Sequence, residues 1–531
     1  MQDDLQAFRV QQMVKCLKDF QIPCRWIPDM GYQYGYPQFN FYPPSIFYVG
    51  GLLNLIGIQV IDTVKMLFIA GFILSALTMF LFLKALLGKW PAFVGAMLYS
   101  IVPYKAAEVY VRGSLSEFFS FVFFPLIFWA SLQIVKTGKL KYLAWLAFSI
   151  GLLLLTHNLM SFIFLPIFGI WVITQIVIWR KWQMLPKIIG AILLGVGLAA
   201  FFTIPVIFEN KYAHLETLTS GYFDYRQHFV TLKQLFLSNH FGYGSSYLGP
   251  NDDLSLSTGI VQWILGLLAV ILALFNFKKD RKLTVLTMIL AVLSLVVLFL
   301  MHQKSAFIWE KLPILNLLQF PWRFLSDSTF LLSILGAISI YLINNISKKL
   351  AIGVGIISIV ILFTLHGSFF QPKAWLNISD KDKFSGQSWE KQLTISIFDY
   401  LPIYAKLPPN KKAPEKPETL EGQVELISYQ KGSDFQTGEI KVEKNSTLRL
   451  PLFDFPGMEV TVDGEKVAHF HDCRGQEYCL GLITFMVNEG SHKIKAQLKD
   501  TPIRLLSNII SLISISVVGI LFLKKHEKYH S

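Results

Sequence analysis

Hydrophobic and polar residues alternate in long blocks along most of this chain. Several apolar blocks approach the ~20 residues that a membrane-spanning helix needs, and charged residues are gathered between them. This pattern predicts a polytopic bundle of transmembrane helices. The predicted spans are 64–87, 91–104, 115–136, 140–156, 159–179, 185–208, 258–277, 282–301, 324–344, 350–368 and 504–523.

Basic runs beside these spans indicate how the chain is oriented. Each pair of neighbouring runs is separated by two predicted spans, so all of them can lie on one side of the membrane. The positive-inside rule places that side in the cytoplasm of a plasma membrane. The runs lie at 136–141, 180–181, 278–282, 348–349 and 524–525.

The same orientation leaves most of the acidic and unusual polar residues outside the cytoplasm. These residues fall in 1–43, 108–117, 209–257, 302–323 and 371–502, and His157 lies at the outer membrane edge. Polar chemistry at one end of apolar helices predicts a membrane enzyme that works at its outer surface.

Composition agrees with a membrane protein and narrows the range of partners. Of 531 residues, 53% are hydrophobic and 16% are charged, against roughly 25% charged residues in soluble domains. The net charge of +13 comes from cations at membrane edges, where topology and anionic lipid account for them. We therefore expect membrane lipid, and no nucleic acid, as a partner.

The regions outside the spans divide the chain into five parts. Residues 1–43 are predicted to form a first external loop, and because no span precedes it we expect its preceding helix to be missing from this sequence. Residues 44–370 form the transmembrane helical domain, in which 45–60 is interfacial or re-entrant. Residues 371–422 are a Pro- and Lys-rich linker. Residues 423–502 alternate like strands, with a hairpin signal at Asp463-Gly464, and predict an extracytoplasmic β-sandwich. Residues 503–531 provide a transmembrane anchor and a cytoplasmic tail.

Four cysteines fall in two close pairs, Cys16 with Cys24 and Cys473 with Cys479, both in segments predicted to be external. Two disulfides and four independent thiols are both compatible with this spacing. The sequence has no Cys/His spacing typical of a metal site, so no cofactor is predicted. A divalent metal stays an open alternative without support.

Several motifs together resemble the YfhO-like bacterial membrane proteins, also described as 6-pyruvoyl-tetrahydropterin synthase-related membrane proteins. The pterin label implies no function here, because the chain lacks the clustered histidines that such a zinc enzyme needs. The motifs are Asp3-Asp4-Leu5 with Arg9, Pro23-Cys24-Arg25-Trp26, Gly35-Tyr36-Pro37, Phe41-Tyr42-Pro43-Pro44, Tyr110-Val111-Arg112-Gly113 with Glu117, Thr156-His157-Asn158, Phe320-Pro321-Trp322-Arg323 and Asp454-Phe455-Pro456-Gly457.

This family is similar to the GT-C glycosyltransferases. The resemblance implies a sugar donor linked to polyprenyl phosphate and a glycan, lipid or protein acceptor outside the cytoplasm. In such enzymes an acidic residue in the first external loop is catalytic, and the matching position here is Asp3 or Asp4. We take Asp4 as the candidate general base, with Asp3 as its neighbour. The alternative for both is a helix N-cap or an ordinary solvated pair.

Arginines are candidates to bind the donor phosphate. Arg25 and Arg112 could each bind phosphate in a bidentate manner. Alternatively, Arg25 stacks on Trp26 and Arg112 pairs with Glu108 or Glu117.

Three further positions at the outer ends of spans are candidate substrate-binding residues or have structural roles. Arg323 follows Pro321-Trp322 at the end of a span, where an arginine facing lipid would be costly; interfacial snorkelling is its alternative. Glu117 and the pair His157-Asn158 could contact substrate. Glu117 could equally be a helix-start acid, and His157 a satisfied structural histidine.

These observations favour an integral membrane glycosyltransferase with a GT-C-like fold. One alternative is a transporter or flippase of lipid-linked saccharides, which would need charged positions near the bilayer midplane. Another is a non-catalytic scaffold for envelope assembly in which the β domain is the working part.

Overall fold

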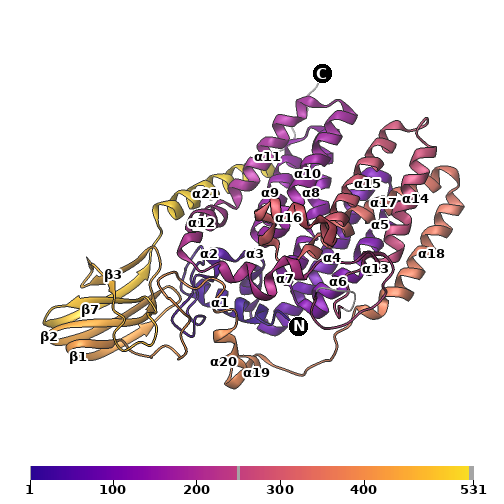
Figure 1. Ribbon diagram of the computed structural model, residues 1–531. Helices are drawn as coiled ribbons and strands as arrows, with labels where there is room; N and C mark the ends of the chain where they lie inside the picture. Colours follow the sequence, from indigo (N-terminus) through magenta and orange to yellow (C-terminus); the bar gives the residue numbers. More distant parts are fainter. Residues whose placement is uncertain (1, 248–251, 525–531) are drawn as a thin grey trace.

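The computed structural model describes residues 2–247 and 252–524. Its helices form a bundle, and a β domain lies beside one end of that bundle (Figure 1). The N terminus lies at the end nearer the β domain, while the last helix finishes at the opposite end (Figure 1). A helical bundle, a C-terminal β domain and a final apolar helix confirm the predicted fold class.

Within the described residues, seven helical segments are long and apolar enough to cross a membrane. They match seven of the predicted spans within a few residues. They consist of α4 (Val60–Leu87), α7 (Leu115–Ser120) with α8 (Phe123–Thr137), α10 (Asn158–Trp179), α15 (Arg281–Met301), η9 (Pro321–Phe324) with α17 (Leu325–Ile346), α18 (Lys348–His366) with η10 (Gly367–Phe369), and α21 (Pro502–Leu523).

Other predicted spans are helical but shorter. α9 (Leu140–Thr156) and α14 (Ile260–Phe275) are apolar helices of 17 and 16 residues, and α5 (Lys89–Ser100) has 12. The segment 45–60, expected to be interfacial or re-entrant, contains the short helix α3 (Ser45–Leu55). It packs against α1 (Gln6–Lys18) in the N-terminal region.

The predicted span 185–208 is not straight. α11 (Leu185–Leu198) and α12 (Ala200–Glu209) belong to two helical segments bent by 70° at Ala199. Ser511 of α21 lies at the break, donating to the carbonyl of Gly197 at 3.0 Å and accepting from the amide of Phe201 at 2.8 Å. A hydroxyl inserted into the helix ladder in this way is a recognised cause of a kink.

Short helical elements connect the spans. The most consequential are α6 (Pro103–Ala106) and the π-helix η1 (Ala107–Arg112), which ends at Gly113 in the left-handed conformation (φ 67°). The others are α2 (Gln38–Phe41), η2 (Trp182–Met184), η3 (Asn210–Tyr212), η4 (Glu216–Thr219), η5 (Gly221–Phe223), η6 (Tyr225–Gln227), α13 (Leu232–Phe236), η7 (Gln303–Ser305), α16 (Ala306–Lys311), η8 (Pro313–Leu318), α19 (Asp380–Lys383) and α20 (Gly386–Thr394).

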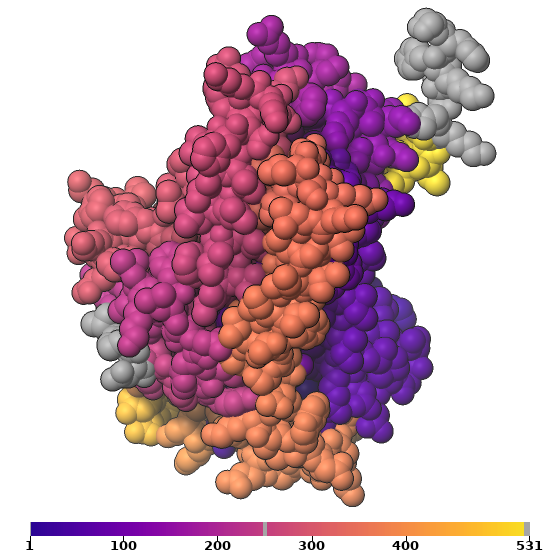
Figure 2. Space-filling view, turned by 90° about the vertical axis from the view of Figure 1, so that its right-hand side faces the viewer, coloured from indigo at the N-terminus to yellow at the C-terminus, as the bar shows by residue number. Residues whose placement is uncertain are grey.

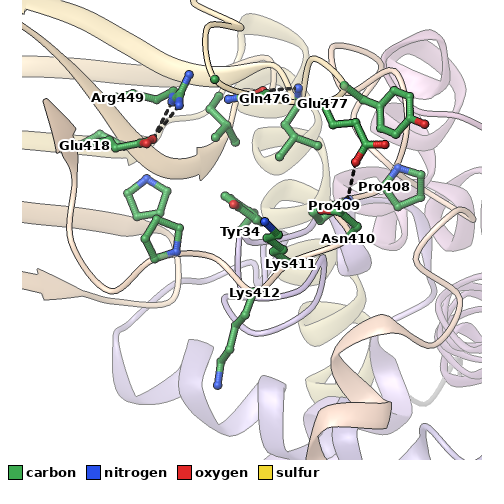
Figure 3. Close-up of a pocket in the computed structure, with 17 residues that line it drawn as sticks. Tyr34, Pro408, Pro409, Asn410, Lys411, Lys412, Glu418, Arg449, Gln476 and Glu477 are labelled. Atoms are coloured by element: carbon green, nitrogen blue, oxygen red, sulfur yellow. Dashed lines mark hydrogen bonds and ion pairs between the residues drawn. The ribbon is translucent and has the colours of Figure 1, made fainter. Parts of the chain in front are cut away.

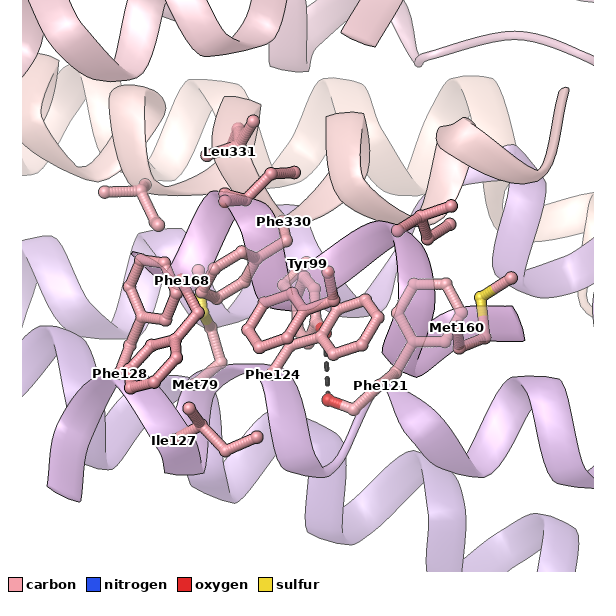
Figure 4. Packing of buried hydrophobic residues seen from close by; sticks show 14 of the residues in the cluster. Met79, Tyr99, Phe121, Phe124, Ile127, Phe128, Met160, Phe168, Phe330 and Leu331 are labelled. Carbon is pink, nitrogen blue, oxygen red and sulfur yellow. Dashed lines mark hydrogen bonds between the residues drawn. The ribbon is translucent and has the colours of Figure 1, made fainter. Parts of the chain in front are cut away.

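Aromatic rings fill the centre of the bundle (Figure 4). Phe124 of α8 stacks on Phe164 of α10 with ring centroids 4.0 Å apart, and Phe330 of α17 meets Phe128 edge-on at 4.8 Å. Such pairs contribute about 0.5–1.5 kcal/mol each beyond their area burial. α17 is therefore the central helix, buried along most of its length.

The outer surface of the bundle is apolar. α18 lies along the outside of the molecule, and the chain after it continues to the lower end (Figure 2). Its exposed side chains include Ile356, Ile357 and Phe363. A continuous apolar face of this kind suits contact with lipid.

The β domain is one antiparallel sheet with two branches. β1 (Glu418–Lys431) runs along one edge of the long strand β2 (Phe435–Phe453). On the other edge, the first half of β2 pairs with β7 (Gly490–Leu498) and the second half with β6 (Leu482–Val487). β3 (Met458–Val462) and β4 (Glu465–Val467) extend the first branch, and β5 (Phe470–His471) extends the second.

Two features could not be read from the sequence pattern: where the β domain begins and how the cysteines pair. β1 begins at Glu418, inside the segment expected to be linker, and α19 and α20 lie in the same segment. Both cysteine pairs, Cys16–Cys24 and Cys473–Cys479, form disulfides, so the disulfide alternative is the one that the structure adopts.

Candidate functional site

Glu117 lies at the centre of a buried charged cluster at the end of the bundle near the N terminus. Its side chain is 0% exposed. Tyr104 donates to Oε1 at 2.7 Å, and Arg112 Nη1 and Arg323 Nε lie 2.9 and 3.3 Å from Oε2. Both carboxylate oxygens are therefore engaged, and Glu117 orients two arginines.

The π-helix η1 supplies two members of this cluster. Glu108 and Arg112 form an ion pair along it, and Gly113 ends the helix so that the chain can turn into α7. The Arg112 guanidinium also lies 4.6 Å from the centre of the Trp322 ring, which is cation–π geometry. π-helical turns often occur at functional sites.

Arg323 reaches the cluster from η9, before the central helix α17. Its Nη1 donates to the Leu318 carbonyl at 2.6 Å and to Gln319 Oε1 at 3.0 Å. Among the described residues, Arg323 Nη2 and the Nε and Nη2 of Arg112 make no hydrogen bond. Guanidinium donors left free beside each other can bind an oxyanion.

The N-terminal segment docks directly onto the π-helix. The amides of Gln2 and Asp3 donate to the carbonyls of Val111 and Arg112 at 2.9 and 2.8 Å. The Asp3 carboxylate is held by Arg9 at 2.9 Å. Its side chain is 31% exposed, so Asp3 is an accessible carboxylate beside the buried cluster.

Tyrosines cover the other side of Arg9. Its guanidinium lies 4.2 Å from the centre of the Tyr42 ring. Tyr400 of the linker stacks on Phe41 at 5.6 Å and lies within electrostatic range of Arg9 and Arg323. The cluster is thus covered by residues from the first loop and from the linker.

His157 and Asn158 lie where α10 begins. His157 Nδ1 accepts from the Met160 amide at 3.2 Å and so caps the helix. An imidazole that accepts at Nδ1 is neutral and carries its proton on Nε2. His157 lies within electrostatic range of Glu117 and Arg323. The half-buried Asn158 is the first residue of α10.

Two predicted site residues lie elsewhere. Asp4 is 58% exposed and pairs with Lys383 at 2.6 Å, so its carboxylate is turned away from the arginines. The expectation that Asp4 is the base, with Asp3 only its neighbour, does not fit this geometry, because Asp3 and not Asp4 adjoins the cluster.

Arg25 belongs to a second buried cluster, which fixes the final helix. It donates to Asn40 and Asn508 and lies 3.6 Å from Asp500, beside the ion pair between Glu209 and Arg504. Burial, together with the adjacent Arg504 charge, lowers the pKa of Arg25 to about 10. Arg25 therefore joins the first loop to α21, and the structure does not place it beside Arg112.

Sequence reasoning missed several buried polar residues. Tyr104 bonds Glu117 and Arg9 pairs with Asp3. Arg9 belongs to one of the quoted motifs, but nothing in the local sequence of either residue separates it from interfacial residues. Lys105 is fully buried, bonds Ser75 at 3.0 Å and lies over the Tyr99 ring. Asp327 is also fully buried, and neither oxygen has a hydrogen-bond partner in the described chain. The central helix thus holds an ionisable residue that its apolar neighbours conceal.

The acidic pair does not fit a divalent metal. Asp3 faces Arg9 and Asp4 faces Lys383, whereas Mg²⁺ and Ca²⁺ prefer oxygens that converge. No group of three or more potential metal ligands occurs in residues 2–247 and 252–524.

The fold and this cluster define a polytopic membrane protein with a polar site at one end of its helices. The chain belongs to the membrane-protein family of the 6-pyruvoyl-tetrahydropterin synthase related domain, whose pattern matches residues 39–371. That match includes Glu117, Arg112 and Arg323, and ends before the β domain.

The structure also resembles the crystal structure of the Archaeoglobus fulgidus oligosaccharyltransferase in the apo form, with a TM-score of 0.42 and 12% sequence identity. The similarity covers 78% of this chain and 57% of that enzyme. The chain thus spans little more than half the length of that protein. No curated protein matches the sequence.

Proposed function

We propose that this protein is a membrane glycosyltransferase that moves a sugar from a polyprenyl-phosphate donor to an acceptor outside the cytoplasm. The supporting observation is that Arg112 and Arg323 carry free guanidinium donors beside Glu117, while the accessible carboxylate of Asp3 belongs to a segment whose amide bonds the Arg112 carbonyl. A lipid-phosphate donor needs cations for the leaving phosphate and a carboxylate for the acceptor proton.

In the proposed reaction these groups act as follows. An acceptor hydroxyl attacks the anomeric carbon and the carbon–oxygen bond to phosphate breaks. The bonding electrons leave with the phosphate, which Arg112 and Arg323 stabilise, and the hydroxyl proton passes to Asp3. Glu117 positions the two arginines but takes no proton, because its side chain is 0% exposed and paired with both of them, whereas the Asp3 side chain is 31% exposed.

The surroundings of the site suit a lipid-linked substrate. Trp322 stacks on Phe320 with centroids 4.7 Å apart, directly beside Arg112. Exposed apolar residues of the adjacent connection, Phe307, Ile314 and Leu317, provide a surface for acyl or isoprenoid chains. The donor phosphate would reach the arginines while its lipid stays in the membrane.

The proposal is tested by replacing each of the two neighbouring aspartates, Asp3 and Asp4, in a separate variant. Washed membranes of the source organism containing wild type, Asp3→Asn or Asp4→Asn would receive radiolabelled polyprenyl-phosphate glucose, mannose or N-acetylglucosamine. Loss of a general base typically costs about 10²–10⁴-fold, so Asp3→Asn should lose transfer while Asp4→Asn stays within about twofold. Wild-type transfer by Asp3→Asn, or no transfer from any donor by wild type, contradicts the proposal.

The buried Asp327 gives the transporter alternative one observation in its favour, since intramembrane acids commonly mark transport pathways. Liposome flux of a fluorescent polyprenyl-phosphate sugar separates the two functions. A transporter would move the donor across the membrane without consuming it, and Asp327→Asn would slow that movement. A transferase would consume the donor and give no net flux.

A further inference from the structure

A separate pocket of about 430 Å³ lies on the β domain, within the range of about 300–1,000 Å³ typical of small-molecule sites. The linker, the Cys473–Cys479 loop, the N-terminal loop and the three strands β1, β2 and β6 all contribute to its walls. Tyr34 lies between two polar pairs, Arg449 with Glu418 on one side and Asn410 with Glu477 on the other (Figure 3).

The first polar pair is fixed in place. Arg449 is 4% exposed and donates to Glu418 Oε2 from Nη2 at 2.7 Å and from Nε at 3.0 Å. Its Nη1 donates to the carbonyls of Asp472 and Arg474. The Arg449 charge is neutralised inside the protein, so this side offers hydrogen bonds and little net charge.

The second side carries a donor that the protein does not use. Asn410 donates to Glu477 at 2.9 Å, and Gln476 Oε1 accepts from the Leu480 amide at 2.8 Å. The Gln476 Nε2 is buried and has no partner among the described residues. A buried donor without a partner costs about 1–3 kcal/mol, which a ligand acceptor would recover.

The loop that carries these groups is held at both ends. The Cys473–Cys479 disulfide closes it, and the Cys479 carbonyl accepts from the Lys406 amide of the linker at 2.9 Å. Groups fixed before binding lose less conformational entropy when a ligand arrives. The side chains on this loop therefore already have the positions in which they would contact a ligand.

The chemistry of the walls selects a polyhydroxylated ligand. Each polar pair presents a donor beside an acceptor, and a sugar hydroxyl both donates and accepts. Tyr34, Tyr478 and the prolines offer apolar faces for ring C–H groups. Since Glu418 and Glu477 are each bonded to a lining side chain, no group of free carboxylates favours a cation.

The pocket and the Glu117 cluster share two chain segments. Tyr34 lies in the same loop as Tyr42, which covers Arg9, and its carbonyl accepts from the Phe453 amide at 3.0 Å. The linker runs from Tyr400, which stacks on Phe41 of that loop, to Asn410 in the pocket wall. A chain-like ligand could follow these segments from one site to the other.

We propose that this pocket binds an oligosaccharide and holds the acceptor glycan while its end reaches the Glu117 cluster. The saccharide assignment stands on the pocket itself, whereas its role as the acceptor site rests on the proposed function. The isosteric change Gln476→Glu tests the unused donor, because it keeps the Oε1 acceptor and replaces the Nε2 donor with an oxygen. Gln423→Glu, at an exposed position of β1 outside the pocket, is the matched control.

The experiment applies purified full-length protein in detergent to a printed panel of hexose, N-acetylhexosamine and uronate oligosaccharides. The affinity of the best binder is then measured by thermophoresis. Gln476→Glu should bind about tenfold more weakly than wild type, while Gln423→Glu is unchanged. Asp3→Asn should bind the panel normally even if it cannot transfer sugar, which separates this proposal from the proposed function.

Two results would overturn the saccharide assignment. One is a wild type that binds no member of the panel. The other is a Gln476→Glu protein that binds as tightly as Gln423→Glu. If the panel binds through the pocket but Gln476→Glu transfers sugar at the wild-type rate, the pocket is a saccharide site and its role as the acceptor site is wrong.

Discussion

The amide of Asp3 donates to the carbonyl of Arg112 at 2.8 Å, so the N-terminal segment and the π-helix form one structural unit. The carboxylate proposed as the base and a guanidinium proposed to bind phosphate are thereby kept in register by the backbone. Any movement of η1 would move both groups together.

Replacing Arg323 with lysine should lower sugar transfer sharply. Lysine keeps the charge, but its single ammonium cannot reach Glu117, the Leu318 carbonyl and Gln319 at once and also leave a donor free for phosphate. By comparison with the loss of one preorganised donor, turnover should fall roughly 10²–10³-fold. Initial rates over a range of donor concentrations measure this. Arg226→Lys, an exposed arginine paired with Asp224, is the control, and equal rates for both variants would rule out the assigned role.

Replacing Glu117 with glutamine should destabilise the fold as well as remove activity. The change leaves Arg112 and Arg323 buried without the carboxylate that lies between them. Removing one partner of a buried ion pair costs about 3–5 kcal/mol. Denaturant unfolding of the purified protein in detergent measures the loss. The exposed Glu216→Gln should change stability little, and a Glu117→Gln protein as stable as that control would contradict this prediction.

Replacing Glu209 with glutamine should loosen the β domain. Glu209 pairs with Arg504 of α21 at 2.9 Å, and Arg25 lies close by. Without the carboxylate, two buried guanidinium groups repel each other, and amide exchange around 499–508 should become at least tenfold faster. Glu459→Gln, at a surface pair with Lys466, is the control. Unchanged exchange in Glu209→Gln would show that other contacts hold the domain.

The hydrogen bond between His492 and Asp463, 2.7 Å long, should make stability depend on pH. This hydrogen bond raises the pKa of His492 above its ordinary value. The stabilisation is therefore fully present below the unfolded pKa of about 6.5 and is lost as pH rises through the higher folded pKa. The Tm difference between wild type and His492→Gln should shrink from pH 6 to pH 8. In an Asp463→Asn background, the same substitution should give a difference that does not vary with pH; a difference that grows with pH would contradict the assignment.

Much of the helical arrangement could be predicted, because long apolar blocks leave few alternatives. The positions of basic runs also grouped Glu117, His157 and Arg323 at one end, and the structure brings these three together although 206 residues separate Glu117 from Arg323. The charge pattern places Glu117, His157 and Arg323 at the same face of the membrane. Residues at one face can contact one another even when they are far apart in the sequence.

Contacts made by irregular segments could not be predicted in this way. Asp3 and Asp4 are adjacent in sequence, yet one faces Arg9 and the other Lys383, a difference set by how the linker folds back. Arg25 has a side chain typical of a phosphate ligand, but it donates a hydrogen bond to Asn508, near the other end of the chain. Asp327 is surrounded by apolar sequence, and only packing shows that its carboxylate has no hydrogen-bond partner in the described chain.

The packing of α1 has a consequence for synthesis of this protein. Phe8 of α1 meets Trp389 of α20 at 5.7 Å, and Leu393 lies fully buried in the same apolar core. α3 and α4 also pack against α1 and follow it closely in the chain, but these α20 residues are translated hundreds of residues later, when most of the bundle has already entered the membrane. Until then, part of the apolar face of α1 is uncovered on the ribosome-bound chain. This makes α1 a site suited to chaperone binding.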